Sequence, residues 1–71
     1  MRVENKEYYY FEDKDKLDFL QFLTQNGMMM TTFANKCDIS LSLLSLIING
    51  KRAITKNVID EFGKNGFKVN I

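Results

Sequence analysis

The stretch S-L-S-L-L-S-L-I-I-N-G, from Ser40 to Gly50, gives the clearest helix signal in the chain. Ser40 is a good N-cap, because its hydroxyl can accept a hydrogen bond from the free N–H groups of a first helical turn. Gly50 is a good residue to follow a helix, because glycine adopts the left-handed conformation without a Cβ clash. The stretch therefore predicts a helix of about two and a half to three turns over residues 40–49.

A second short helix is predicted just before it, over residues 30–37, within the sequence T-T-F-A-N-K-C-D of Thr31 to Asp38. Ala34 lies in its middle, and a side chain this small lets the following helix come close. Asp38 stands in the turn between the helices, where Asp tolerates a left-handed conformation better than most residues. Ile39 is expected to point from this turn into the core. Two short helices separated by a turn are therefore predicted.

The residues that follow, Asn49-Gly50-Lys51-Arg52, complete a pattern that resembles the helix-turn-helix of small Cro- and repressor-like phage regulators. The resemblance covers about residues 17–66. It implies a mainly α fold: a four-helix helix-turn-helix (Cro/repressor-like) domain with short N- and C-terminal β-strands, with residues 1–71 as a single domain. It also implies that Leu44 and Ile47 pack the second helix of the motif on the core. After that helix, the resemblance implies phosphate contacts at Lys51 and Arg52.

Two further helices and two terminal strands complete the prediction. The helices cover about residues 14–26 and 55–65. The aromatic run Y-Y-Y-F favours a strand over about residues 7–11, and alternating apolar and polar side chains favour another over about residues 67–71. We expect these strands to pair with each other and to pack on the helices, because an isolated two-stranded sheet is marginal in water. The alternative is that an edge strand pairs with another copy of the chain.

The helix over residues 14–26 is amphipathic, and Gly27 follows it as a helix-ending residue. Its expected core-facing side consists of Leu17, Leu20 and Leu23, widened by Phe19 and Phe22. In the helix over residues 55–65, Thr55 is the expected N-cap, and the expected buried residues are Val58, Ile59 and Phe62.

Composition limits the chemistry that this chain can perform. Its 71 residues suffice for one domain, its net charge is +1, and it has one cysteine and no histidine. A disulfide within the chain is therefore impossible, and a zinc site of the usual kind lacks ligands. Without a histidine to activate it, Cys37 is expected to be a small buried apolar residue. We find no nucleotide-binding glycine loop and no converging carboxylate pair, so we expect no enzyme, no cofactor and no metal.

No targeting or membrane segment is predicted. The N-terminal residues lack the apolar stretch of a signal peptide, and no apolar run approaches the roughly 20 residues of a membrane span. A cytoplasmic location is expected, which for a phage regulator means the host bacterial cell.

The outward side of the helix over residues 40–49 departs from the family pattern. In Cro-like regulators these positions carry polar or basic side chains that read DNA, whereas here leucines and serines occupy them. Two methionines stand where the family has polar residues, and they either fold inward or add flexible apolar surface. An exposed apolar patch of this kind is expected to be covered by a second copy or by another protein. The candidate partner-binding residues are Met29, Met30, Leu41, Ser42, Leu43, Ser45 and Leu46.

This departure sharpens the resemblance. The sequence is similar to the modulator-of-repression, or anti-repressor, proteins encoded beside the repressor in temperate phages of Gram-positive bacteria. That similarity implies that the helix over residues 40–49 binds the DNA-binding domain of the phage repressor. Operator binding by the repressor would then be blocked, which would act on a lysis–lysogeny switch.

Two alternatives stay open. The chain could be a Cro-like repressor that reads operator DNA, alone or jointly with the phage repressor, through the hydroxyls of Ser42 and Ser45. Its candidate phosphate contacts are Lys36, Lys51, Arg52 and Lys56. Alternatively, two copies could form a homodimer that buries the helix over residues 40–49.

Overall fold

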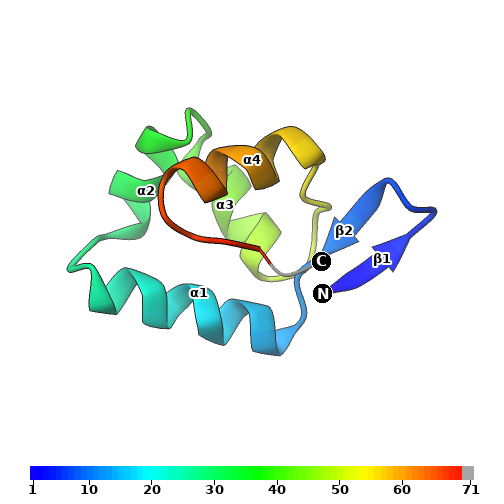
Figure 1. The fold of residues 1–71 in the computed structure, drawn as a ribbon, viewed down its shortest axis with the longest axis horizontal. Coiled ribbons are helices and arrows are strands. Elements are labelled where there is room, and N and C mark those ends of the chain that lie inside the picture. Colours follow the sequence, from blue (N-terminus) through cyan, green and yellow to red (C-terminus); the bar gives the residue numbers. More distant parts are fainter. Residues whose placement is uncertain (70–71) are drawn as a thin grey trace.

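Helices dominate the computed structural model of this chain, which describes residues 1–69 (Figure 1). In chain order the elements are β1 (Arg2–Glu4), β2 (Tyr8–Tyr10), α1 (Asp13–Gln25), α2 (Met30–Lys36), α3 (Leu41–Ile48) and α4 (Lys56–Lys64). The four predicted helices are confirmed to within one residue at each end. Within the described residues, no helix combines the length and the apolar character needed to cross a membrane.

Side-chain caps explain where α3 and α4 begin. The hydroxyl of Ser40 accepts a hydrogen bond from the N–H of Leu43 at 3.0 Å. The hydroxyl of Thr55 accepts one from the N–H of Val58 at 3.4 Å. Each bond satisfies one of the N–H groups that the first turn of a helix leaves free. The predicted caps at Ser40 and Thr55 are therefore confirmed.

The sheet corrects the predicted strand pairing. β2 pairs antiparallel with β1, and the facing residues are Arg2 and Tyr10, Val3 and Tyr9, and Glu4 and Tyr8. Residues 67–69 form no strand, and positions 70 and 71 of the predicted strand lie outside the described residues. The local partner prevails because a short turn between β1 and β2 costs little loop-closure entropy. In this turn Asn5 and Lys6 take left-handed conformations, with φ of 54° and 61°.

The hairpin is tied to the helical body by the loop between α3 and α4. The N–H of Ile54 donates to the carbonyl of Tyr9 at 2.8 Å. Gly50, in the same loop, has φ of 71°, and a Cβ there would lie only 2.6 Å from the carbonyl oxygen of Phe11. Both the conformation and the close approach at position 50 therefore require glycine.

An aromatic cluster forms the core between the helices. The Phe19 ring centroid lies 5.1 Å from that of Phe33 and 5.8 Å from that of Phe62, and all three side chains are fully buried. Phe67, in the segment after α4, packs edge-on against Phe19 at 5.1 Å. Edge-to-face contacts of this kind add to the gain from apolar burial. Residue 67 therefore covers the core, whereas the sequence pattern predicted that it begins a strand.

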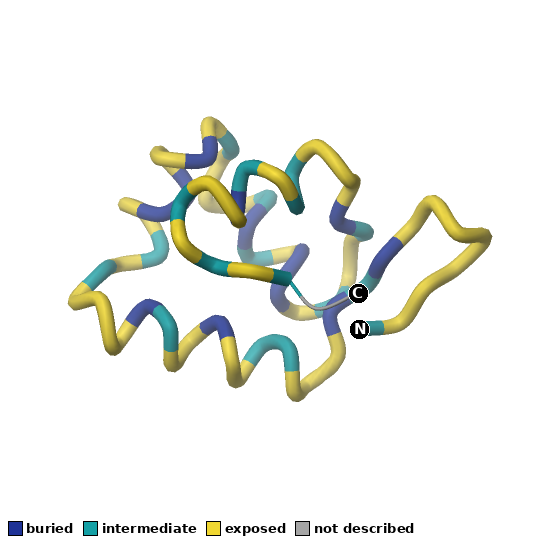
Figure 2. Tube along the Cα trace, in the orientation of Figure 1, coloured by how far each residue is buried: buried dark blue, intermediate teal, exposed yellow. Residues whose placement is uncertain are grey.

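α1 faces the core with only part of the predicted side. Phe19 and Leu23 are buried and Phe22 is half-buried, whereas Leu17 is 61% exposed and Leu20 is 36% exposed (Figure 2). The prediction that Leu17 and Leu20 belong to the core is wrong. The rings of Phe19 and Phe22 remove more apolar surface from water than the two leucines would, so the helix turns these rings inward.

Candidate functional site

The connection between α2 and α3 fixes the direction in which α3 presents its outer side. Ala34 on α2 is buried, and its carbonyl accepts a hydrogen bond from the N–H of Ile39 at 3.0 Å. Asp38 has φ of 59°, and this left-handed conformation ends α2 and redirects the chain. The small residue at position 34 and the left-handed turn at position 38 are confirmed. The two helices consequently pack together across a short turn (Figure 1).

α3 has a buried side and an outer side of different composition. Its buried residues are Leu44, Ile47 and Ile48. We call the remaining residues the α3 outer face: Leu41, Ser42, Leu43, Ser45 and Leu46. Leu41 and Leu46 are 45% and 40% exposed, Ser42 is exposed, and Leu43 and Ser45 are half-buried. Since residues three or four positions apart are neighbours on a helix, Leu46 lies beside both Leu43 and Ser42. The α3 outer face therefore mixes leucine side chains with two serine hydroxyls.

The two candidate methionines near the start of α2 differ in burial. Met29 is 72% exposed, whereas Met30 is half-buried and packs against the core. Of the two alternatives for these side chains, the outward one holds for Met29 and the inward one for Met30. Met29 therefore adds a flexible apolar side chain to the surface just before α2.

A hydrogen-bonded chain fixes the C-terminal end of α3. Lys16 Nζ on α1 donates to Asn49 Oδ1 at 2.6 Å. Asn49 Nδ2 donates to the carbonyl of Ser45 at 2.8 Å and lies 3.5 Å from the Ser45 hydroxyl. Ser45 is thus engaged within the chain, and Ser42 is the freer of the two hydroxyls on the α3 outer face. Sequence reasoning missed this contact, because no local pattern connects residues 33 positions apart.

A second exposed apolar site lies on α1. Leu17 and Leu20 line a shallow hollow, together with Gln21, Thr24 and Gln25. Leu20 lies one helical turn after Lys16. Lys16 bonds to Asn49 at the end of α3, so Leu20 lies on the side of α1 that is nearest to this end. Sequence reasoning placed both leucines in the core and therefore did not identify them as surface residues. The available signal was the number of large apolar side chains on α1, which is more than one side of a helix can bury.

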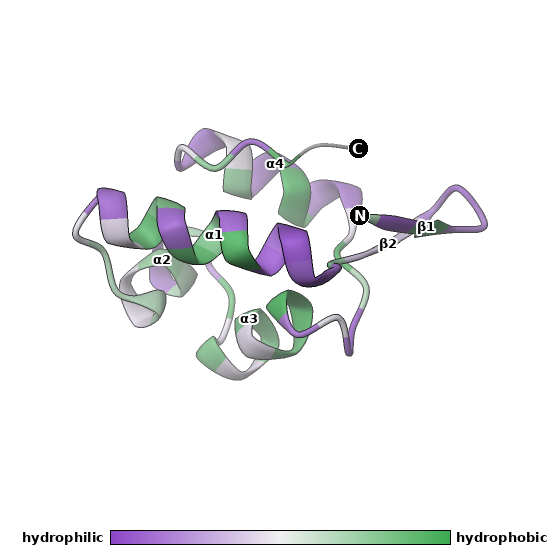
Figure 3. Cartoon of the chain, turned by 90° about the horizontal axis from the view of Figure 1, so that it is seen from below, coloured by the Kyte–Doolittle hydropathy of each residue, from purple (hydrophilic) through white to green (hydrophobic). Residues whose placement is uncertain are grey.

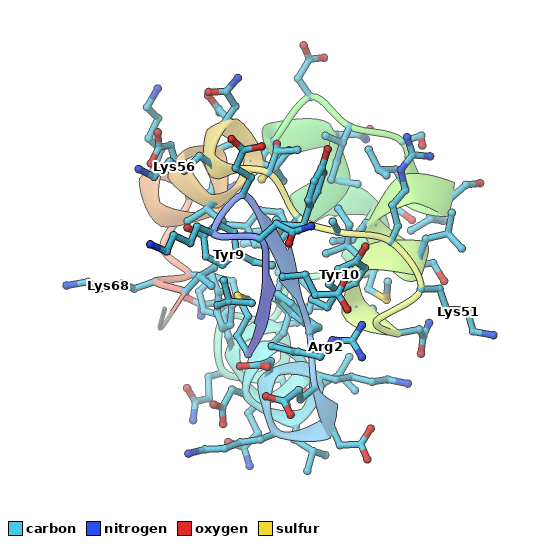
Figure 4. All side chains as sticks on the ribbon, turned by 90° about the vertical axis from the view of Figure 1, so that its right-hand side faces the viewer. Arg2, Tyr9, Tyr10, Lys51, Lys56 and Lys68 are labelled. Carbon is cyan, nitrogen blue, oxygen red and sulfur yellow. The ribbon has the colours of Figure 1, made fainter. Side chains whose placement is uncertain are left out.

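The predicted phosphate contacts do not converge on one site. Lys36, Lys51, Arg52 and Lys56 are all exposed. In Figure 4 the side chains of Lys51 and Lys56 extend to opposite sides of the hairpin. Lys36 belongs to the last turn of α2, where its carbonyl accepts a hydrogen bond from Asn65 Nδ2 at 3.4 Å. Only Lys51 and Arg52 stay together, as neighbours in the chain directly after α3.

Titratable groups offer little reactive chemistry in the part of the chain that the structure describes. No group of three His, Cys, Asp or Glu residues there is placed to hold a metal ion. Burial raises the pKa of the Cys37 thiol, a contact from Asn65 Nδ2 at 3.6 Å lowers it by less, and the charge of Glu61 raises it further. Cys37 is therefore held as a neutral thiol in the core, as predicted.

Searches of protein-family profiles, curated proteins and solved structures found no significant match to this chain. Among the features described above, the exposure of leucines on the α3 outer face is the unusual one.

Proposed function

We propose that this chain is a phage regulator that binds a partner protein through the α3 outer face, as an anti-repressor does. The proposed partner is the DNA-binding domain of the phage repressor, whose operator surface would be covered in the complex. The exposure of Leu46 at the middle of the α3 outer face is the observation that carries the proposal. Leucine cannot hydrogen-bond a base edge, so this position suits a protein partner better than DNA.

A helix-turn-helix identity for α2 and α3 is part of the proposal. It is supported by the buried Ala34, the left-handed Asp38 and the fully buried Ile47. These residues stand at the spacing of the Cro-like pattern that the sequence resembles. Under this proposal α3 is the recognition helix of the motif, and it recognises protein in place of DNA.

Burial of the exposed apolar side chains favours association with a protein. Covering a leucine completely is worth about 1.5–3 kcal/mol, so the exposed parts of Leu41 and Leu46 are worth roughly 1 kcal/mol each. Met29 adds a third apolar side chain, and the hydroxyl of Ser42 can give the partner a specific hydrogen bond. Because association itself costs several kcal/mol, we expect the partner to cover more of the surface than these residues alone.

A second candidate function is operator DNA binding of the Cro type, alone or jointly with the repressor. Its support is the position of Lys51 and Arg52, which are both exposed directly after α3, where the family contacts phosphates. Such contacts hold a protein on DNA of any sequence and make binding salt-dependent. Ser42 could add a single hydrogen bond to a base, which discriminates weakly compared with a bidentate contact.

Fluorescence anisotropy on a labelled operator separates the two functions. The operator is titrated with this chain alone, and then with the phage repressor already bound. Release of the repressor, without direct binding by this chain, supports the anti-repressor function. Direct binding that prefers the operator sequence and weakens with salt would support the Cro-like function and refute the protein-binding proposal for α3.

The variant Leu46→Asp tests the surface itself. We expect it to abolish release of the repressor, because a carboxylate would have to be buried in the interface without a partner. Leu17→Asp makes the same change at an exposed leucine of α1 and serves as the matched control. Circular dichroism of both variants checks that the fold is kept. Normal release by a folded Leu46→Asp variant would exclude the α3 outer face as the binding surface.

A further inference from the structure

The hairpin leaves one edge of its sheet free among residues 1–69. One edge of β2 bonds to β1, and Tyr9 of β2 forms an isolated bridge to Ile54, whereas β1 has β2 as its only strand neighbour there. The hairpin projects from the helical body, with β1 as its outer strand (Figure 1). A free edge presents N–H and C=O groups that can pair with another strand.

The sequence of β1, Arg2-Val3-Glu4, is complementary to its own reverse. When two β1 strands run antiparallel about a two-fold axis at Val3, Arg2 of each copy faces Glu4 of the other. Residues that face each other directly in an antiparallel pair interact, and opposite charges stabilise the pair. We propose that two copies of this chain associate through β1 in this register and form a continuous four-stranded antiparallel sheet.

The outer face of the paired sheet would carry a charged and aromatic row. Arg2 already extends over this face, with its guanidinium carbon 4.7 Å from the centroid of the Tyr10 ring and its Nε 3.6 Å from Glu4 Oε1 (Figure 4). In the paired sheet Arg2 keeps Tyr10 on one side and gains Glu4 of the second copy on the other. The guanidinium therefore already lies on the face of the sheet that carries Glu4, which is the face on which Glu4 of the second copy would stand.

The opposite face of the sheet would carry an apolar row. Val3 faces Tyr9 in the hairpin; Tyr9 is buried against the helical body, whereas Val3 is 46% exposed. The two-fold axis brings the two Val3 side chains directly opposite each other and covers their exposed parts. A second copy matches both the apolar row and the charged row, so it is the occupant that fits.

The association is weak and depends on concentration. Strands of three residues bury far less than the roughly 1,200 Å² of a stable interface, while a net charge of +1 leaves little repulsion between copies. α3 and the hairpin lie on different parts of the molecule (Figure 3). The dimer therefore leaves the α3 outer face accessible on both copies, and it does not depend on the function proposed above.

Sedimentation velocity of the full chain, over concentrations up to the millimolar range at low salt, tests this proposal. No residues are added before Met1, whose ammonium group pairs with carboxylates. Arg2→Glu and Glu4→Arg each place like charges opposite one another at both facing pairs. Each variant alone is expected to associate at least about tenfold more weakly than the wild type. An equimolar mixture of the two variants should associate again, because both facing pairs then carry opposite charges.

Charge reversal elsewhere provides the control. Glu61→Lys and Lys64→Glu reverse an exposed ion pair of 3.4 Å on α4, and both should associate like the wild type. The proposal is overturned by a wild-type chain that stays monomeric at every concentration, by single variants that associate normally, or by a mixture that associates no better than its components. If Leu46→Asp dissociates the dimer while Arg2→Glu has no effect, the contact lies on α3. That result would also overturn the proposal.

Discussion

Lys16 Nζ on α1 lies 2.6 Å from Asn49 Oδ1 at the end of α3. The charged donor makes this hydrogen bond stronger than one between neutral groups, although both side chains remain accessible to water, which weakens its net effect. The bond fixes the position of the last turn of α3 on α1. It thereby helps to set the direction in which Leu46 faces solvent.

Removal of the Lys16 donor should loosen the contact between α1 and α3. We expect Lys16→Met to lower the free energy of unfolding by about 0.5–1.5 kcal/mol, because methionine keeps an apolar stem but cannot donate to Asn49. Lys14→Met, at an exposed position of the same helix, should change it by less than about 0.5 kcal/mol. Urea unfolding measures both. Equal losses in the two variants would mean that the bond to Asn49 contributes nothing measurable.

The corrected orientation of α1 predicts very different costs for two leucines. Leu23→Ala should lower the free energy of unfolding by about 2–5 kcal/mol, since it opens a cavity in the core. Leu17→Ala should change it by no more than about 0.5 kcal/mol, because this side chain is largely in water. Thermal and urea unfolding of the two variants measure the difference. If Leu17→Ala lowered the free energy of unfolding more than Leu23→Ala does, Leu17 would have to belong to the core.

The helix limits could be predicted because the signals that set them act within a few residues. Ser40 and Thr55 cap the turns that follow them. The exposure of Leu17 and Leu20 could not be predicted in the same way, because Leu17 and Phe19 belong to two neighbouring apolar stripes that were both expected in the core. Only the packing of Phe19 against distant rings on α2 and α4 decides between them.

The strand β1 was missed for a similar reason. Its residues, Arg2–Glu4, place one valine between two charges, and no local pattern marks them as a strand. Their conformation follows from pairing with Tyr8–Tyr10 across the turn. The alternation over residues 67–71 was a misleading signal, because Phe67 is recruited by the aromatic core.

Sequence reasoning located the outer side of α3 well and its surroundings poorly. Once Leu44 and Ile47 are assigned to the core, the helical period alone identifies the residues on the opposite, outer side of α3. Burial of Met30, in contrast, depends on the space left in the core. The separation of Lys51 from Lys56 depends on the path of the loop between them, which bonds to β2 through Ile54. Neither can be read from spacing along the chain.

The N-terminal ammonium group predicts a pH dependence of stability. The nitrogen of Met1 lies 3.0 Å from Glu12 Oε1 and 3.0 Å from Asp15 Oδ2. Its hydrogen bonds to Glu12 and Asp15 raise its pKa above the ordinary 8.0, against a smaller opposing effect of burial. Because the pKa is higher in the folded state, the stabilisation is fully present below pH 8.0 and is lost as the pH rises through the raised value.

Acetylation of this amine isolates its contribution. The melting temperature of the free chain should exceed that of the acetylated chain at neutral pH, and the difference should shrink as the pH rises above the ordinary pKa of the amine. Differential scanning calorimetry of both forms across this range measures the change. A difference that stays constant with pH would show that the ammonium charge has no part in stability.

Two glycines should respond to alanine in opposite directions. Gly50→Ala should lower the free energy of unfolding by about 1–3 kcal/mol or more, because φ is positive there and the added Cβ would meet the carbonyl oxygen of Phe11. Gly63→Ala should raise it by about 0.5–1 kcal/mol, since position 63 lies within α4 and a Cβ there meets open space. Chemical denaturation measures both. A Gly50→Ala variant as stable as the wild type would contradict the close approach of this loop to the carbonyl of Phe11.

Substitution of the basic residues after α3 distinguishes binding to DNA phosphates from binding to a protein. If the chain contacts operator phosphates, the double variant Lys51→Ala with Arg52→Ala should weaken binding on every sequence and reduce the salt slope by about 1.8, since each phosphate contact contributes about 0.9. Lys36→Ala with Lys56→Ala removes the same charge from two separated positions, so it should change the slope less. Anisotropy titrations over a salt series measure both. If instead the chain acts only on the repressor, neither double variant should alter repressor release as strongly as Leu46→Asp, because the leucine lies within the α3 outer face and the cations lie beyond the helix.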